Sequence, residues 1–465
     1  MTKRTMLMVL GMAGLFSVQL PVLSGLFEKS EYAARRAGLM DKIPDGAAVL
    51  LGAMIPPDRS EFYQNNDLMY FCGVEVPNAV LVIDGKSRES TLFFTISDRE
   101  AEGMGLPPDL VKEPVVHTGL ERVQPLDQFA QFLSRLTLET PVLYTMYRPG
   151  ELIPDNTNET FRSWQSQITM NIWDGRLTRE LQFVERLKEK FPYIEVRDCS
   201  RLVWDLRKIK SPAEIAVMKE AGRIAVSAHT AVINATRPGI PEHELAAVFE
   251  YVCKREGAQE LAFNTIIMSG KNHAYGHYHK HDRVLKDGDF LILDAGPDHG
   301  YYNIDASTSF PANGTFSSRQ KEVYELALLV RKLCQNNYRP GVTLRFIGER
   351  VKAELIARGH NPDIAQLSGE IRNGGYNHSV GMATHDVLGT FARQDEILQP
   401  GFVFACDIQI IYPEEDLGVR IEDTIAITED GCINLSAGLP RTVEEVETLM
   451  KTDGIIQILK KKGQY

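Results

Sequence analysis

Two strand–turn–strand patterns in the C-terminal half of this chain constrain its fold more than any other feature. The first covers residues 290–310 with a turn at 297–300, and the second covers 403–425 with a turn at 413–416. In both patterns, acidic residues interrupt otherwise apolar strands. Alternate residues of a strand share one face, so a hairpin closed at each turn would gather these carboxylates on one side of a sheet.

The positions of the turns also predict which carboxylates oppose each other. A first hairpin centred between residues 299 and 300 pairs Asp294 with Asp305. A second hairpin centred between residues 414 and 415 pairs Asp407 with Glu422. Opposed side chains start about 4.5–5.5 Å apart, and two negative charges so placed repel unless a cation lies between them. The sequence therefore predicts a site for two divalent metal ions, about 3.5–4 Å apart.

Two histidines lie between the hairpins, at positions 378 and 385 of a glycine-flanked stretch. One imidazole is a candidate metal ligand and the other a candidate catalytic donor. Each of these histidines and carboxylates, taken singly, would more often be an ordinary core or surface residue. Their joint placement in mirror-related positions favours a metal site. Four carboxylates with one imidazole form a hard ligand set that favours Mn²⁺, with Co²⁺ and Zn²⁺ as alternatives.

The chain is long enough for two domains, because single cores stop growing at about 250–300 residues and this chain has 465. Residues 26–207 alternate strand-like and helix-like runs, which predicts a smaller α/β domain. A capping box at 211–214 then begins a new helix, so the second domain is predicted to cover 208–465. Within it, Arg-Pro-Gly follows a helix at 237–239 and again at 339–341. This repetition indicates a duplicated α+β unit with a site at its seam.

Residues 1–25 read as an export signal, with Lys3 and Arg4 before an apolar run and small residues at 22–24. They predict a cleaved signal peptide or a retained anchor, hence a periplasmic, extracellular or membrane-anchored protein. The alternative is a buried N-terminal helix in a cytoplasmic protein. The net charge of −11, without a basic stripe, argues against nucleic acid as a partner. None of the six cysteines forms a Cys-x-x-Cys pair, which excludes a zinc ribbon or redox motif and leaves disulfides undecided.

The order of acidic residues and histidine resembles that of the pita-bread metallopeptidases, specifically aminopeptidase P and prolidase, over nearly the whole chain. The matching segments are 287–296, 378–386, 398–401 and 418–423, together with 66–71 and 77–80 in the N-terminal half. The resemblance implies an α+β fold with a C-terminal pita-bread domain, a duplicated unit around a curved antiparallel sheet. It also implies a water or hydroxide that bridges two metal ions, held by Asp294, Asp305, His378, Asp407 and Glu422.

The same resemblance implies roles for four further residues. His385 and His277 match active-site histidines, and His385 is expected to contact substrate and stabilise the tetrahedral intermediate. Arg420 matches an arginine near the metals, although it could also serve as a structural counter-ion. Asp67 matches an N-terminal aspartate linked to the polar network of the active site, although its spacing alone would suit an ordinary loop residue.

One ligand departs from the family pattern. The family usually has Glu-Pro where this chain has Asp407 and Ile408, so the carboxylate is shorter by one methylene. Altered metal preference, lower activity or a different substrate are the open consequences. A separate crowd of histidines at 273, 277, 279 and 281 could form its own zinc site, or could be a solvated, titrating loop.

The resemblance implies a metal-dependent aminopeptidase that releases the N-terminal residue from peptides with proline in second position. A prolidase that cleaves Xaa-Pro dipeptides is the near alternative. A catalytically weakened pita-bread module that binds peptides is the alternative from another class. The expected partner is a peptide substrate, and the family suggests a homo-oligomer, either a dimer or a tetramer.

Overall fold

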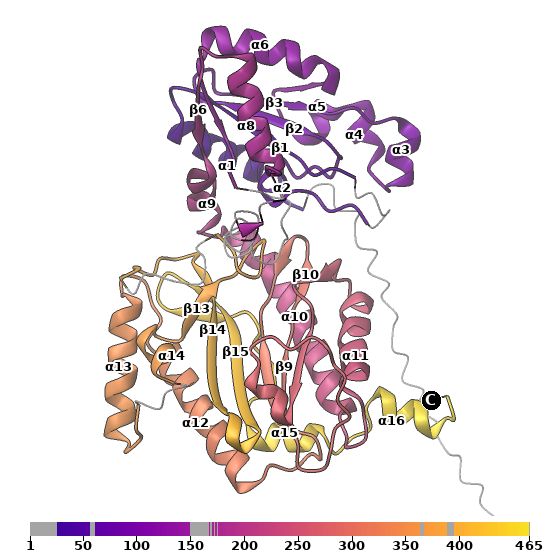
Figure 1. The fold of residues 1–465 in the computed structure, drawn as a ribbon, viewed down its shortest axis with the longest axis vertical. Helices are drawn as coiled ribbons and strands as arrows, with labels where there is room; N and C mark the ends of the chain where they lie inside the picture. The colour runs from indigo at the N-terminus through magenta and orange to yellow at the C-terminus, as the bar shows by residue number, and fades with distance from the viewer. Residues whose placement is uncertain are drawn as a thin grey trace, which may run out of the picture.

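The computed structural model describes residues 26–55, 61–148, 167, 170–171, 173, 175–362, 367–387 and 395–464. These residues form a mixed α+β structure in two parts, which Figure 1 shows one above the other. The predicted signal peptide or anchor at 1–25 lies outside the described residues. Within those that are described, no helix is long and apolar enough to cross a membrane.

The N-terminal part is a six-stranded mixed sheet with helices on both faces. Its strands, in the spatial order β4-β3-β2-β1-β5-β6, are β1 (Ala47–Leu51), β2 (Val80–Asp84), β3 (Glu89–Phe93), β4 (Arg122–Gln124), β5 (Val142–Thr145) and β6 (Glu195–Asp198). Its helices are α1 (Lys29–Lys42), α2 (Asn66–Cys72), α3 (Asp98–Gly103), α4 (Pro108–Lys112), α5 (Pro114–Thr118), η1 (Leu126–Gln128), α6 (Phe129–Glu139) and α8 (Arg179–Lys190).

Strand alternation explains this packing. Ala48 and Leu50 of β1 pack into a core that includes Leu39 of α1. Ala47 and Val49 point the other way, into a core with Leu133 of α6 and Leu187 of α8. Because a strand sends successive side chains to opposite faces, the apolar run of β1 buries both faces of the sheet.

Two consecutive helices connect the N-terminal part to the second part. Helix α9 (Ser200–Arg207) leads to α10 (Pro212–Ala235), whose first turn is closed by a capping box between Ser211 and Glu214. α11 (Glu242–Arg255) follows. A second helix pair, α12 (Ser318–Gln335) and α13 (Leu344–Ala357), repeats this arrangement.

Equivalent backbone contacts confirm the repeat. The N–H of Gly239 donates to the carbonyl of Leu285 at 2.8 Å, and the N–H of Gly341 donates to that of Leu398 at 2.9 Å. Both glycines have positive φ, at 88° and 82°, which explains why each Arg-Pro pair is followed by glycine.

An antiparallel sheet occupies the middle of the second part, with α12 and α13 beside one half and α10 and α11 beside the other (Figure 1). Its strands, in the order β13-β14-β15-β12-β9-β8, are β8 (Ile266–Ser269), β9 (Phe290–Asp294), β12 (Ser307–Pro311), β13 (Tyr376–Ser379), β14 (Val403–Tyr412) and β15 (Leu417–Ile427), and β16 (Cys432–Asn434) pairs with β15. The remaining elements are β7 (Glu260–Leu261), η2 (Gly270–Ala274), β10 (Pro297–His299), β11 (Tyr302–Asn303), α14 (Ser368–Arg372), η3 (Pro413–Glu415), α15 (Val443–Leu449) and α16 (Ile455–Lys461).

The register predicted for the second hairpin is confirmed, and that for the first is wrong. Asp407 pairs with Glu422, but Asp294 pairs with Ser307 instead of Asp305. The first turn falls one residue later than predicted, at Gly300-Tyr301, both with positive φ, so the pairing shifts by two residues. The second strand of this hairpin is also interrupted, at 304–306. A shift of two keeps a residue on the same face, so Asp305 stays on the side of Asp294, one pleat further along.

The bend between β9 and β10 requires glycine at position 296, because a Cβ there would collide with the carbonyl oxygen of Ile304. We predict that Gly296→Ala destabilises the protein by about 1–3 kcal/mol or more, since the backbone must move to relieve the overlap. Chemical denaturation measures this. Gly431→Ala is the matched control, because a Cβ at Gly431 meets nothing within 4 Å, and its effect should stay within about 0.5 kcal/mol. Equal stability of both variants would contradict the packing described here.

Candidate metal centre and active site

A row of polar side chains crosses four neighbouring strands of the C-terminal sheet. Asp294 of β9 pairs with Ser307 of β12, which pairs with Glu422 of β15, which pairs with Asp407 of β14. All four are buried. Strand register therefore brings carboxylates more than 100 residues apart in sequence into one line across the sheet.

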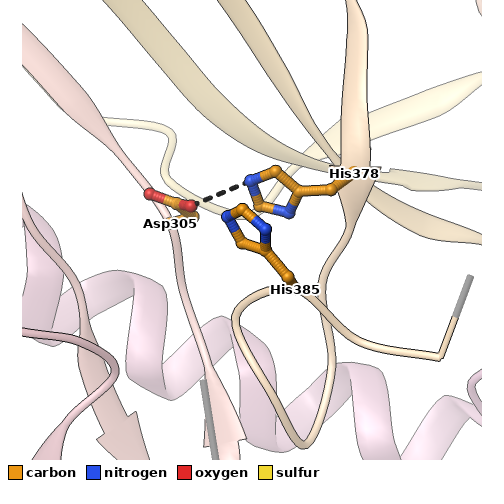
Figure 2. A group of neighbouring side chains, drawn as sticks. All are labelled: Asp305, His378 and His385. Carbon is orange, nitrogen blue, oxygen red and sulfur yellow. Dashed lines mark ion pairs between the residues drawn. The ribbon is translucent and has the colours of Figure 1, made fainter. Parts of the chain in front are cut away.

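Asp305 and His378 lie beside this row. His378 Nε2 is 3.2 Å from Asp305 Oδ2 and 4.0 Å from Glu422 Oε1. Figure 2 shows the rings of His378 and His385 side by side next to Asp305, and their centroids are 3.8 Å apart. Two sets of residues each bring their ligand atoms within 4.8 Å of one another: Asp294, Asp305 and Glu422 in one, and Asp305, His378 and His385 in the other.

The chemistry of these side chains fits divalent cations. Among the described residues, four buried atoms of this cluster have no hydrogen-bond partner: Oδ1 of Asp294, Oδ1 of Asp305, Nε2 of His378 and Oε1 of Glu422. Buried polar atoms without a partner cost about 1–3 kcal/mol each, so native proteins seldom keep them unless an ion or water satisfies them. All four atoms are metal-ligand types, and they converge from three strands and from the irregular segment at 304–306.

Burial sets the protonation of these groups in the metal-free protein. Desolvation raises the pKa of Asp294 to about 8, despite the opposing charge of Arg420, and also raises the pKa of Asp305 and Glu422. Desolvation lowers the pKa of His378 to about 4, so its imidazole is neutral and able to ligate. A cation bound among the carboxylates would favour their charged forms.

Arg420 balances part of this negative charge. Its guanidinium lies 2.9 Å from Asp407 Oδ2 and 3.3 Å from Glu422 Oε2, and it also contacts Asp294. The structure thus places Arg420 at the predicted metal centre and, at the same time, in the role of counter-ion.

Asp407 differs from the other four predicted ligands. It belongs to neither set of converging ligand atoms. Its carboxylate accepts hydrogen bonds from Arg420 and from Gln409 Nε2, the latter at 2.6 Å. Gln409 was not predicted, although a polar residue two positions from Asp407 in an apolar strand is a signal that could have identified it. Ser307, which donates to Glu422 at 2.8 Å, could have been found in the same way.

His277 is exposed. Desolvation, then the charges of Arg420 and His385, lowers its pKa. It belongs to neither set of converging ligand atoms. His273 is buried, with its ring nitrogens on the carbonyls of Met268 and Asp416. The segment 273–281 does not form a strand. No converging ligand set among the described residues includes His273, His279 or His281. The separate zinc site is therefore without support.

Asp67 lies outside the carboxylate row but is connected to it. Arg207 donates to Asp67 and to Asp386, at 2.6 Å each, and Lys210 lies 3.1 Å from Asp386. Asp386 follows His385 directly. The resemblance implied a link between Asp67 and the active-site network. No local sequence pattern predicted that Arg207 and Lys210 would form the ion pairs of this link.

Comparisons with known proteins agree with this geometry. The chain matches the model of metallopeptidase family M24 over residues 216–429 and that of the aminopeptidase P N-terminal domain over 32–144. It is 30% identical to the Xaa-Pro aminopeptidase of Escherichia coli (strain K12), covering 91% of this chain and 98% of that relative. It is 28% identical to Xaa-Pro aminopeptidase 3 of Mus musculus, covering 83% of this chain and 76% of that relative. The solved structure of a variant of Escherichia coli aminopeptidase P in complex with substrate matches with a TM-score of 0.71 and 28% identity, covering 91% of this chain and 98% of that chain.

The chain therefore belongs to metallopeptidase family M24, with the pita-bread fold preceded by an aminopeptidase P N-terminal domain. It is a hydrolase, and membership of this family implies that it binds divalent metal ions. The two matched regions fall inside the predicted domains at 26–207 and 208–465.

Arg207 generates a stability prediction, because it is 3% exposed and pairs with carboxylates from both parts of the chain. Arg207→Ala leaves two buried carboxylates without this partner and should cost about 3–5 kcal/mol. Arg201→Ala is the control, because Arg201 pairs with Asp205 on the exposed face of the same helix. Its cost should be about 0.3–0.5 kcal/mol. Urea denaturation distinguishes them, and similar midpoints for the two variants would contradict the importance of the buried pairs.

Proposed function

We propose that this protein is an Xaa-Pro aminopeptidase, which releases the N-terminal residue from peptides whose second residue is proline. The observation that carries the proposal is the convergence of four buried ligand atoms from Asp294, Asp305, His378 and Glu422. The Xaa-Pro aminopeptidases of Escherichia coli and Haemophilus influenzae each align with 91% of this chain.

We propose that the site holds two divalent ions. The set Asp294, Asp305 and Glu422 would hold one, and Asp305, His378 and Asp407 would serve the other. A ligand set dominated by carboxylates favours Mn²⁺, with Co²⁺ and Zn²⁺ as alternatives. One solved relative is a Zn-substituted Escherichia coli aminopeptidase P in complex with product.

The ions would supply an acidified water and polarise the scissile carbonyl. The protein's own groups then orient the peptide. His385 stacks on His378, and the charge of His385 contributes to the lowered pKa of His277. We assign both imidazoles to donate hydrogen bonds toward negative charge that develops on the peptide carbonyl. Arg420 holds Asp294 and Asp407, and Asp67 acts through Arg207 and Asp386 on the segment that carries His385.

A prolidase is the near rival, and Xaa-Pro dipeptidases of Pyrococcus horikoshii and Pyrococcus furiosus align with 55% and 64% of this chain. Peptide length separates the two activities. An aminopeptidase of this class cleaves a tripeptide such as Arg-Pro-Pro. Cleavage of Ala-Pro but not of Arg-Pro-Pro, monitored by mass spectrometry, would replace the aminopeptidase with a prolidase.

Assembly and location are further parts of the proposal. The family suggests a dimer or a tetramer, which sedimentation of the purified chain would test; a monomer at all concentrations would refute it. The basic and apolar start of the chain supports export or anchoring. Cell fractionation tests this, and recovery of the full-length chain in the cytoplasm alone would refute it. The acidic net charge supports the absence of nucleic acid as a partner.

Removing the imidazole ligand tests the proposed function directly. His378→Ala should lose metal, measured by elemental analysis, and cleave Arg-Pro-Pro at least about 100-fold more slowly, because metal-assisted hydrolysis needs the ion in place. His360→Ala, at an exposed position, is the control and should keep both properties. Full turnover by the His378 variant would refute the assigned site, and a wild-type protein without metal or activity after Mn²⁺ addition would favour a peptide-binding module.

A further inference from the structure

Gln409 faces the metal centre from the strand that carries Asp407. It lies two residues after Asp407 on β14, hence on the same face, and it pairs with Arg420 across the β14–β15 ladder. Gln409 is half-buried, whereas its neighbours Ile408 and Ile410 are buried in the core on the opposite face. A long polar side chain is therefore held at the centre by strand geometry.

Gln409 and Arg420 restrain the carboxylate of Asp407. Oδ2 accepts hydrogen bonds from Gln409 Nε2 at 2.6 Å and from Arg420 Nη2 at 2.9 Å. Arg420 Nε lies 3.1 Å from each of the two oxygens and donates to both. Donors from two residues therefore restrict rotation of the carboxylate and set the direction of its remaining lone pairs.

This restraint acts on a side chain that is one methylene shorter than glutamate and can adjust its reach toward an ion less. Hydrogen bonds to ligating carboxylates orient them at metal sites in general. Asp407 also stands apart from the set Asp294, Asp305 and Glu422, whose ligand atoms converge without it.

We propose that Gln409 is a positioning residue, which orients Asp407 toward the ion held by Asp305 and His378. The ion among Asp294, Asp305 and Glu422 does not depend on Gln409. The inference rests on the proposed function, because it assumes that the centre binds two ions.

Calorimetric titration of the metal-free full-length protein with Mn²⁺ tests this role. We expect Gln409→Ala to weaken one of two binding events about 10–100-fold and to leave the other unchanged. The melting temperature of the metal-free protein should not change, and kcat at low Mn²⁺ should fall more than KM rises. Gln399→Ala, at an exposed position, should match the wild type in every measurement. The proposal would be overturned if both binding events weakened equally, or if neither weakened.

A longer carboxylate provides a rescue. In the double variant Asp407→Glu with Gln409→Ala, the space left by the glutamine amide can accommodate the added methylene. We expect it to bind the second ion more tightly than Gln409→Ala alone, a non-additive result that identifies coupling between the two positions. A double variant no better than Gln409→Ala would contradict action through Asp407. A wild-type protein that binds fewer than two ions would instead refute the proposed function, so the two failures are distinguishable.

Discussion

The pairing of Ser307 with Glu422 is the contact on which the rest of this centre depends. It is the point where β12 meets β15, and thus where the hairpin of one half joins the hairpin of the other. Arg441 secures it, since its guanidinium donates to the carbonyl of Ser307 at 2.6 Å and to that of Glu422 at 2.7 Å. A slip of one residue there would move Glu422 to the other side of the sheet and separate the ligand sets.

The centre concentrates negative charge where water is scarce, and the fold must compensate for that. On the ligand face, Arg420 contacts three of the carboxylates. On the opposite face of β15, Arg331 and Arg441 pair with Asp423 and hold its pKa far below the ordinary value despite burial. Cations of the protein thus stabilise both faces of one strand. The unsatisfied ligand atoms between them are best satisfied by metal ions.

The sequence predicted those interactions that follow from the alternation of side chains along a strand. The acidic residues in apolar strands predicted the row of ligands, and the turn at 413–416 predicted the pairing of Asp407 with Glu422. The first hairpin was placed wrongly because Tyr301 adopts a positive φ, which bulky residues rarely do, so nothing local marked the turn. Its hydroxyl, bonded to Glu75 and to the N–H of Gln64 in the N-terminal part, shows the tertiary contact that holds this turn.

Local sequence patterns could not predict the contacts between the two parts of the chain. Arg207 joins Asp67, 140 residues before it, to Asp386, 179 residues after it. Only the folded chain shows that this network reaches the segment of His385. The family was identified from resemblance to known motifs. The restraint of Asp407 by Gln409 was inferred from the register of β14 and β15.

Anomalous X-ray diffraction from crystals grown with Mn²⁺ tests the central claim most directly. The account predicts two peaks about 3.5–4 Å apart, one against Asp294, Asp305 and Glu422 and the other against His378. A protein with no peak at this row of carboxylates, or with manganese bound only elsewhere, would contradict it.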